Sequence, residues 1–182
     1  MTGYDYIIVG GGASGLQLAD ALGSDPYFSN KRIALIEQQR SRSNDRTWCF
    51  WEQGEGTFDN ILYHSCDYIR FAGPGFDRTE ALDPFTYKMV RASDFYREYL
   101  ARIARHPNIE SINATVRALQ QVGDGVRVVT DSGHYHGTQA FTSVHFGDRE
   151  ALMQPYPVLR QHFLGWFIRS ENPVFDPRSA TF

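Results

Sequence analysis

The chain has 182 residues, of which 21 are acidic and 18 are lysine or arginine, so its formal net charge is -3. Hydrophobic residues make up 42% and charged residues 21%, which are globular proportions and exclude a disordered chain. The mild acidity, without a lysine and arginine cluster, argues against a nucleic-acid partner. At about 150 residues per domain, the length allows one domain, or one domain and part of another.

The first part of the chain predicts a strand, a helix and a second strand. Residues 4–9 are strand formers that stop at glycines, and residues 32–36 are a second apolar run that ends at Glu37. Between them, residues 13–23 carry alanine or leucine at every third position, which predicts a helix. Together they indicate a βαβ unit with parallel strands and a right-handed crossover.

The middle of the chain predicts shorter elements. Strands are expected at 66–71, 85–90 and 109–112. Ser93 is a good N-cap residue with Asp94 in the first turn, and it predicts a helix over 94–104. The apolar stripe of that helix consists of Phe95, Tyr99, Leu100 and Ile103.

After residue 115 the hydrophobic period changes to two, which is typical of strands. The expected strands of a β-meander are 116–122, 126–130 and 134–136, with turns at Asp124-Gly125 and Ser132-Gly133. Residues 139–144 are expected to return to the main sheet as a separate strand. The aromatic segment 160–168 also has the composition of a strand.

The first glycines predict a phosphate-binding loop. Residues 10–15 match G-x-G-x-x-G directly after a strand and at the start of a helix. Gly10 permits the tight turn, Gly12 lets a pyrophosphate approach the backbone, and Gly15 lets the helix pack against the strand. The helix N-terminus offers N–H groups and partial positive charge to phosphates. A glycine-rich turn in an unrelated α/β protein is the alternative.

Glu37 completes this pattern at the end of the second strand, where an acidic residue accepts hydrogen bonds from ribose hydroxyls. Its charge would repel a 2′-phosphate, so FAD or NAD fits better than NADP. The predicted cofactor-binding residues are Gly10, Gly12, Ala13, Ser14, Gly15 and Glu37. The β-meander favours FAD, because such an insertion is usual in flavoproteins of the glutathione-reductase type. The expected fold class is α/β, with a Rossmann-like FAD/NAD(P)-binding domain of that type.

Other candidate residues have plainer alternatives. Arg91 is predicted to contact the flavin pyrophosphate, or it is an exposed arginine at a helix start. The aromatic segment 46–51, with Arg46, Trp48 and Trp51, is a candidate lining for an apolar or polyene ligand. An aromatic core is the alternative that the residues alone favour.

No metal site is predicted. His134 and His136 alternate on one strand without an evident third ligand, so solvated histidines are expected. The two cysteines have no metal-ligand spacing, which fits a reduced, cytoplasmic setting. Neither a signal peptide nor an apolar run long enough to span a bilayer is found, so membrane contact would be peripheral.

Three segments resemble the bacterial lycopene β-cyclase family. They are residues 5–16, residues 44–51 (Asn-Asp-Arg-Thr-Trp-Cys-Phe-Trp), and residues 161–168 with their continuation through 173–177 to 180–182. The first segment is shared with many flavoproteins, and the other two are much more specific. The resemblance implies an enzyme that converts lycopene into β-carotene with reduced FAD, and with NAD(P)H as reductant. It also implies work at the membrane, where the carotenoid dissolves.

The resemblance also implies a domain organisation. Residues 1–150 would form the FAD/NAD(P)-binding domain, with strands of an antiparallel-sheet substrate domain interleaved near 60–90, and 151–182 would begin the substrate-binding sheet. The acidic catalytic motif of the family follows its Ala-Thr-Phe segment, which here is Ala180 to Phe182, so no catalytic residue is assigned. The chain alone is therefore expected not to cyclise lycopene. An FAD-dependent hydroxylase or prenyl reductase and an inactive flavin-binding fragment remain alternatives.

Overall fold

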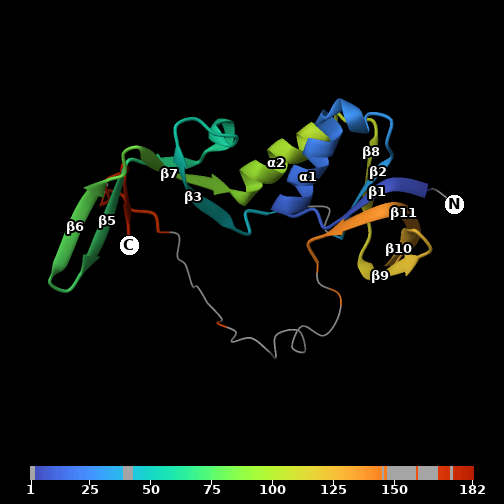
Figure 1. The fold of residues 1–182 in the computed structure, drawn as a ribbon. Helices are drawn as coiled ribbons and strands as arrows, with labels where there is room; N and C mark the ends of the chain where they lie inside the picture. The colour runs from blue at the N-terminus through green and yellow to red at the C-terminus, as the bar shows by residue number, and fades with distance from the viewer. Residues whose placement is uncertain (1–2, 39–42, 145, 147–158, 160–167, 173) are drawn as a thin grey trace. The chain divides into compact units, whose positions relative to one another are not determined.

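The computed structural model describes residues 3–38, 43–144, 146, 159, 168–172 and 174–182. The chain divides into two compact units, one built from residues 1–42 and 96–158 and the other from 43–95 and 159–182 (Figure 1). The boundary at residue 95 falls within helix α2 (Ala92–Ile103). The assignment of 1–150 to cofactor binding and of 151–182 to a substrate domain stays a prediction.

The first unit is built on one six-stranded sheet in the order β8-β2-β1-β11-β10-β9. Its strands are β1 (Gly3–Val9), β2 (Ile33–Glu37), β8 (Ile109–Asn113), β9 (Val116–Val122), β10 (Gly125–Thr130) and β11 (Gly133–Thr142). The first four strands in that order are parallel, and β10 and β9 are antiparallel to their neighbours. Helix α1 (Ala13–Ser24) and the single turn η1 (Pro26–Phe28) connect β1 to β2.

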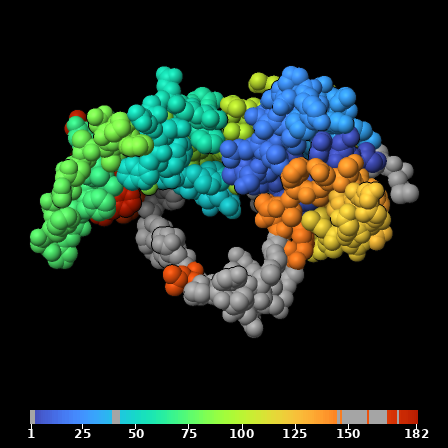
Figure 2. Space-filling model, in the orientation of Figure 1, coloured from blue at the N-terminus to red at the C-terminus, as the bar shows by residue number. Residues whose placement is uncertain are grey.

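The core of this unit explains why two short apolar runs become its central strands. Most side chains of the strands β1 and β2 are apolar and buried, as is typical of the central strands of a parallel sheet. Val128 of β10 joins Tyr4, Ile7 and Ile36 in one buried cluster. Each such side chain contributes about 1.5–3 kcal/mol on burial. Figure 2 shows the orange and yellow atoms of β9–β11 directly against the blue atoms of the N-terminal elements.

The predicted βαβ unit is confirmed almost to the residue, but the meander is not built as expected. Residues 134–136 and 139–144 were expected as two strands, but residues 133–142 form the single strand β11 instead. Residues 133–137 of β11 pair with β10, and residues 136–142 pair with β1. The two neighbouring strands therefore hold β11 as one continuous strand. The first hairpin turns at Gly123-Asp124 rather than Asp124-Gly125, because Gly123 takes the positive φ of +58°.

Helix α2 also differs from its prediction. It begins at Ala92, two residues before the expected start, so Ser93 lies inside it rather than at its N-cap. The backbone N–H of Ser93 donates to the side chain of Asn44 at 3.4 Å, so a distant residue supplies the acceptor. Tyr96 is buried and Leu100 is exposed, which corrects one member of the predicted stripe.

The second unit contains two three-stranded sheets, in the orders β3-β7-β4 and β12-β5-β6. Their strands are β3 (Thr47–Gln53), β4 (His64–Cys66), β5 (Tyr68–Gly73), β6 (Phe76–Ala81), β7 (Phe85–Arg91) and β12 (Ser179–Thr181). A single turn, η2 (Asp59–Ile61), lies between β3 and β4. All neighbours pair antiparallel except β12, which runs parallel to β5 beside the C-terminus (Figure 1).

The strand expected at 66–71 is two strands in two sheets. The break is at Asp67, whose N–H donates to the carbonyl of Arg178 and whose carbonyl accepts from Leu82. The strands β3 and β6 were not predicted, and the breakers Pro74 and Gly75 form the tight turn of the β5–β6 hairpin. Except for Ile168, the strand expected at 160–168 lies outside the described residues. In the part of the chain that the structure describes, no helix is long and apolar enough to cross a membrane.

Candidate functional site

The loop after β1 has the geometry of a phosphate-binding turn. Gly10 adopts φ +97°, a conformation that L side chains rarely take. A Cβ atom on Gly15 would lie 1.9 Å from the carbonyl oxygen of Gly10, so only glycine permits this approach of helix to loop. A Cβ on Gly12 would meet no protein atom within 4 Å. The packing of the chain therefore requires two of these glycines, and the third faces open space.

Helix α1 begins directly from this loop. Its first backbone bond runs from the N–H of Leu16 to the carbonyl of Gly12 at 3.0 Å. Gly12 has no side chain to cap the helix, and the first turn carries no acidic residue. The helix begins at Ala13. The partial positive charge of its first turn, at Ala13 and Ser14, is therefore available to an anion. This arrangement fits a diphosphate.

Glu37 is brought to the loop by the pairing of β1 with β2. Its Oε2 accepts a hydrogen bond from the backbone N–H of Gly11 at 2.6 Å. The N–H of Gly10 donates to the carbonyl of Ile36 at 2.9 Å, which ties the turn to the end of β2. A carboxylate has about four acceptor positions, so Glu37 can accept bonds from a ribose as well. Sequence separation alone could not show its bond to the loop.

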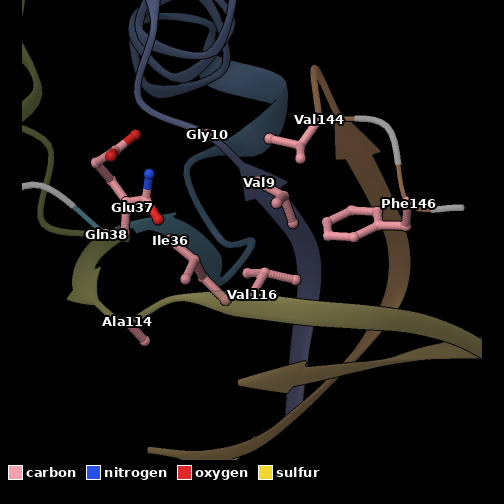
Figure 3. Close-up of a pocket in the computed structure, with 9 residues that line it drawn as sticks. All are labelled: Val9, Gly10, Ile36, Glu37, Gln38, Ala114, Val116, Val144 and Phe146. Atoms are coloured by element: carbon pink, nitrogen blue, oxygen red, sulfur yellow. The ribbon is translucent and has the colours of Figure 1, made fainter. Parts of the chain in front are cut away.

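A pocket of about 100 Å³ opens beside Glu37 (Figure 3). It lies at the carboxyl ends of β1 and β2, where the sheet order reverses between β2 and β11. Its lining consists of Val9, Gly10, Ile36, Glu37, Gln38, Ala114, Val116, Val144 and Phe146. In Figure 3 the apolar side chains gather beside the end of β1, and Glu37 and Gln38 form its polar side. An apolar hollow with one acidic edge suits a nucleoside.

Sequence reasoning missed the pocket residues supplied by the later strands. Ala114 lies between β8 and β9, Val116 begins β9, and Val144 follows β11. No motif marks them, and only their place after parallel strands of one sheet could have indicated them. A second hollow of about 100 Å³ reaches Ser14 and Gly15 from the side of Thr142 and Ser143. The two hollows are both lined by Val9.

Arg91 belongs to the second unit, at the end of β7. Its Nε donates to Oδ2 of Asp94 at 2.6 Å, and its guanidinium lies 4.1 Å from the ring centroid of Tyr63. The bond to Asp94 raises the pKa of Arg91 above its ordinary value. Arg91 is thus a partnered arginine rather than a freely solvated one. Its contact with a flavin stays a prediction.

The aromatic segment is the strand β3, whose alternation sends its rings to opposite faces. Trp48 packs on Phe95 with ring centroids 5.0 Å apart, within an aromatic cluster that also contains Phe50 and Phe58. Trp51 lies on the other face, 4.6 Å from Tyr87 by ring centroids, and is 48% exposed. Trp48 therefore occupies an aromatic core, whereas Trp51 is available to a ligand.

Arg46 is not positioned by the aromatic rings. Its Nη2 lies 3.0 Å from Oδ2 of the neighbouring Asp45, and both side chains are exposed.

Over the described residues, no three histidine, cysteine or acidic side chains are grouped as metal ligands. His134 is exposed and His136 is half-buried on β11. The structure therefore offers no metal centre in the part of the chain that it describes.

Several solved structures resemble the chain. The p-nitrophenol 4-monooxygenase PnpA of Pseudomonas putida has a TM-score of 0.61 and 18% identity over 84% of this chain and 43% of its own. PqsL of Pseudomonas aeruginosa, in complex with 2-aminobenzoylacetate, has a TM-score of 0.60 and 16% identity over 89% and 48%. The halogenase PltM, in complex with phloroglucinol and FAD, has a TM-score of 0.55 and 13% identity over 84% and 36%.

These matches show the fold. The chain spans less than half the length of each of these structures. The α/β class with a Rossmann-like FAD-binding fold, predicted from the glycine loop, is confirmed. None of the curated protein sequences compared with the chain matches it. The sequence model of the family described as Lycopene cyclase protein matches residues 5–182, so the chain belongs to the lycopene cyclase protein family.

Proposed function

We propose that the chain is part of a flavin-dependent lycopene cyclase, an isomerase that converts lycopene into β-carotene. The observation that carries the proposal is the family match over residues 5–182, together with a loop at α1 that fits a dinucleotide. FAD is the proposed cofactor. The proposed site of action is the cytoplasmic side of a membrane, where the carotenoid dissolves.

The cofactor is held by the first unit. The backbone N–H groups at Gly12, Ala13 and Ser14 receive the diphosphate, and Glu37 accepts bonds from the ribose. Bound FAD, kept reduced by NAD(P)H, supplies an electron-rich ring system without net electron transfer, because lycopene and β-carotene are isomers. Arg91 remains a proposed cofactor-binding residue, as a charge-assisted donor to an anionic group.

The chemistry needs a proton source and an apolar, water-free surface. A proton adds to an end-group double bond, the resulting carbocation closes the ring, and a proton leaves, so atoms and charge balance. Aromatic faces stabilise such a cation. In the second unit the exposed ring of Trp51 next to Tyr87 provides such a face. No residue of the chain is assigned as the acid.

The test is the carotenoid profile of lycopene-accumulating cells that express the protein from its complete reading frame. Cyclic carotenes of the same mass as lycopene are expected, and Gly12→Ala should greatly reduce them. Oxygenated or hydrogenated carotenoids without ring closure would overturn the proposal and favour an FAD-dependent oxidoreductase. Unchanged lycopene, from a protein that is folded and carries flavin, would overturn it as well.

A further inference from the structure

Four aromatic rings of the second unit touch one another in a row. Trp51 of β3 and Tyr87 of β7 have ring centroids 4.6 Å apart, and Tyr87 lies 5.9 Å from Phe182. Phe182, which follows β12, lies 5.7 Å from Phe71 of β5. The row therefore begins on the sheet β3-β7-β4 and ends on the sheet β12-β5-β6. We call these four residues the aromatic row.

Three of the four rings are about half exposed although each touches another ring. The exposed fractions are 48% for Trp51, 45% for Phe71 and 57% for Phe182. On the opposite face of β3, Trp48 packs into the aromatic cluster with Phe95 instead. Large apolar rings that gather at a surface, rather than in a core, mark a place where an apolar partner binds.

The end of the row at Trp51 and Tyr87 has no charged side chain across the strand pair. Strand pairing places Cys49 opposite Met89 and Trp51 opposite Tyr87 on one face, and none of the four is an acidic or basic residue. Lys88, the next residue of β7, points to the other face, where Glu52 and Asp59 bind its ammonium group. Burial and a hydrogen bond with Cys49 raise the pKa of Tyr87 to about 12, so its hydroxyl stays neutral. At the other end Phe71 lies opposite Arg78 of β6, which is paired with Glu80, so an ion pair borders that end of the row.

We propose that the aromatic row is the track on which the polyene chain of the substrate lies. A conjugated hydrocarbon has no polar atom and is extended, so it matches a row of exposed rings in which each ring touches the next. A compact ligand would need rings that surround it. This inference rests on the proposed function, since it takes the substrate to be a carotenoid, but it concerns binding rather than the ring closure.

The test measures lycopene binding in detergent micelles by the quenching of tryptophan fluorescence. Phe71→Ala and Phe182→Ala are each expected to weaken binding about three- to tenfold, the value of one aromatic contact. The matched control is Phe76→Ala on the paired strand β6, because Phe76 is 54% exposed and outside the row. Trp51→Phe should remove most of the quenching, whereas Trp48→Phe should leave it.

The outcomes separate this inference from the proposed function. If cyclic carotenes form but Phe71→Ala binds lycopene as tightly as Phe76→Ala does, the track is wrong and the cyclase proposal stands. If the row variants lose binding but cells yield no cyclic carotene, the track stands and the cyclase proposal falls. If the wild-type protein with bound flavin shows no quenching by lycopene, the track is wrong.

Discussion

The glycines after β1 differ in what the protein itself requires of them. Gly15 lies against the backbone of Gly10, and Gly10 needs a positive φ, so both shape the loop. Gly12 combines an ordinary φ of -73° with open space around its Cβ position. An alanine there would cost the fold nothing that the structure shows. Within one motif, Gly10 and Gly15 are therefore required by the fold, whereas Gly12 is not.

Gly12→Ala is expected to weaken cofactor binding without loss of stability, and Gly15→Ala is expected to lower stability. The added methyl of Gly12→Ala should leave the unfolding temperature unchanged and weaken FAD binding about tenfold or more, because it occupies the approach to the diphosphate. Gly15→Ala should lower the free energy of unfolding by about 1–3 kcal/mol, since overpacked backbone must shift. Thermal unfolding and flavin absorbance check both. Wild-type flavin content in Gly12→Ala would show that the diphosphate lies elsewhere.

Tyr4 is expected to make the first unit sensitive to alkali. Its hydroxyl donates to Oε2 of Glu110 at 2.8 Å, and burial and this bond raise its pKa to about 12. An unfolded tyrosine ionises near pH 10, so the stabilisation is complete below that pH and is lost as pH rises from about 10 to 12. Tyr4→Phe should lose about 1 kcal/mol at pH 8.

Urea unfolding of both proteins between pH 8 and 12 measures the Tyr4 effect. Comparison with Tyr4→Phe isolates this residue from Tyr87, which titrates in the same range in both proteins. The stability difference at pH 8 should shrink above pH 10. A difference that stays constant up to pH 12 would contradict the raised pKa of Tyr4.

Strand β7 is the element that organises the second unit. It pairs with β3 on one side and β4 on the other, and it continues directly into α2. Its alternation sends Tyr87 and Met89 to one face and Lys88 and Val90 to the other. The buried Lys88 ammonium donates to Glu52, to Asp59 and to the carbonyl of Gly54, which holds the segment after β3.

Lys88→Met is expected to destabilise the second unit at neutral pH, because two carboxylates lose their cation. The bond from Lys88 lowers the pKa of Asp59, so this stabilisation is present above the unfolded pKa of about 4 and is lost as pH falls through the lower folded value. The difference in melting temperature between Lys88→Met and the wild-type protein should therefore become smaller below pH 4. Thermal unfolding from pH 7 to 3 measures it.

Arg70→Met provides the comparison for Lys88→Met. Arg70 pairs with Asp77 at 2.6 Å, but both side chains are largely exposed on the β5–β6 hairpin. Solvent screens such a pair, so its loss should lower the melting temperature much less. Equal losses in the two variants would show that burial of Lys88 contributes nothing.

At the scale of the whole molecule, the two cysteines cannot cross-link the folded chain. Cys49 and Cys66 lie on β3 and β4, which flank β7 on its two sides. Two strand spacings separate their Cα atoms by about 10 Å, beyond the reach of a disulfide. The unfolding temperature should therefore be the same with and without reductant. A reductant-sensitive melt would contradict the strand order.

Thiol reactivity gives a second measure of the same arrangement. The exposed Cys49 should react first with a thiol reagent in the native protein. Cys66 is buried, and burial raises the pKa of its thiol, so it should react only slowly until the chain unfolds. Equal native rates for the two thiols would contradict the burial of β4.

Local patterns were enough to predict the beginning of the fold. The apolar runs of β1 and β2, the glycine spacing and Glu37 are close in sequence, and their geometry depends on one βαβ unit. Prediction failed where a distant partner decides the structure. Asn44 meets the N-terminus of α2, and Arg178 takes the N–H of Asp67 and ends β4. Neither contact leaves a local signal.

The sequence by itself determined the Rossmann-like class, the glycine-rich loop and the family, because these depend on short segments whose chemistry is set by residue type and spacing. Only the tertiary structure decided which aromatic residues form a core and which form a surface. Trp48 and Trp51 belong to one short motif, but strand alternation and pairing with β7 send them to opposite faces. Phe182 and Phe71 join Trp51 through contacts far apart in the chain, which no local pattern encodes.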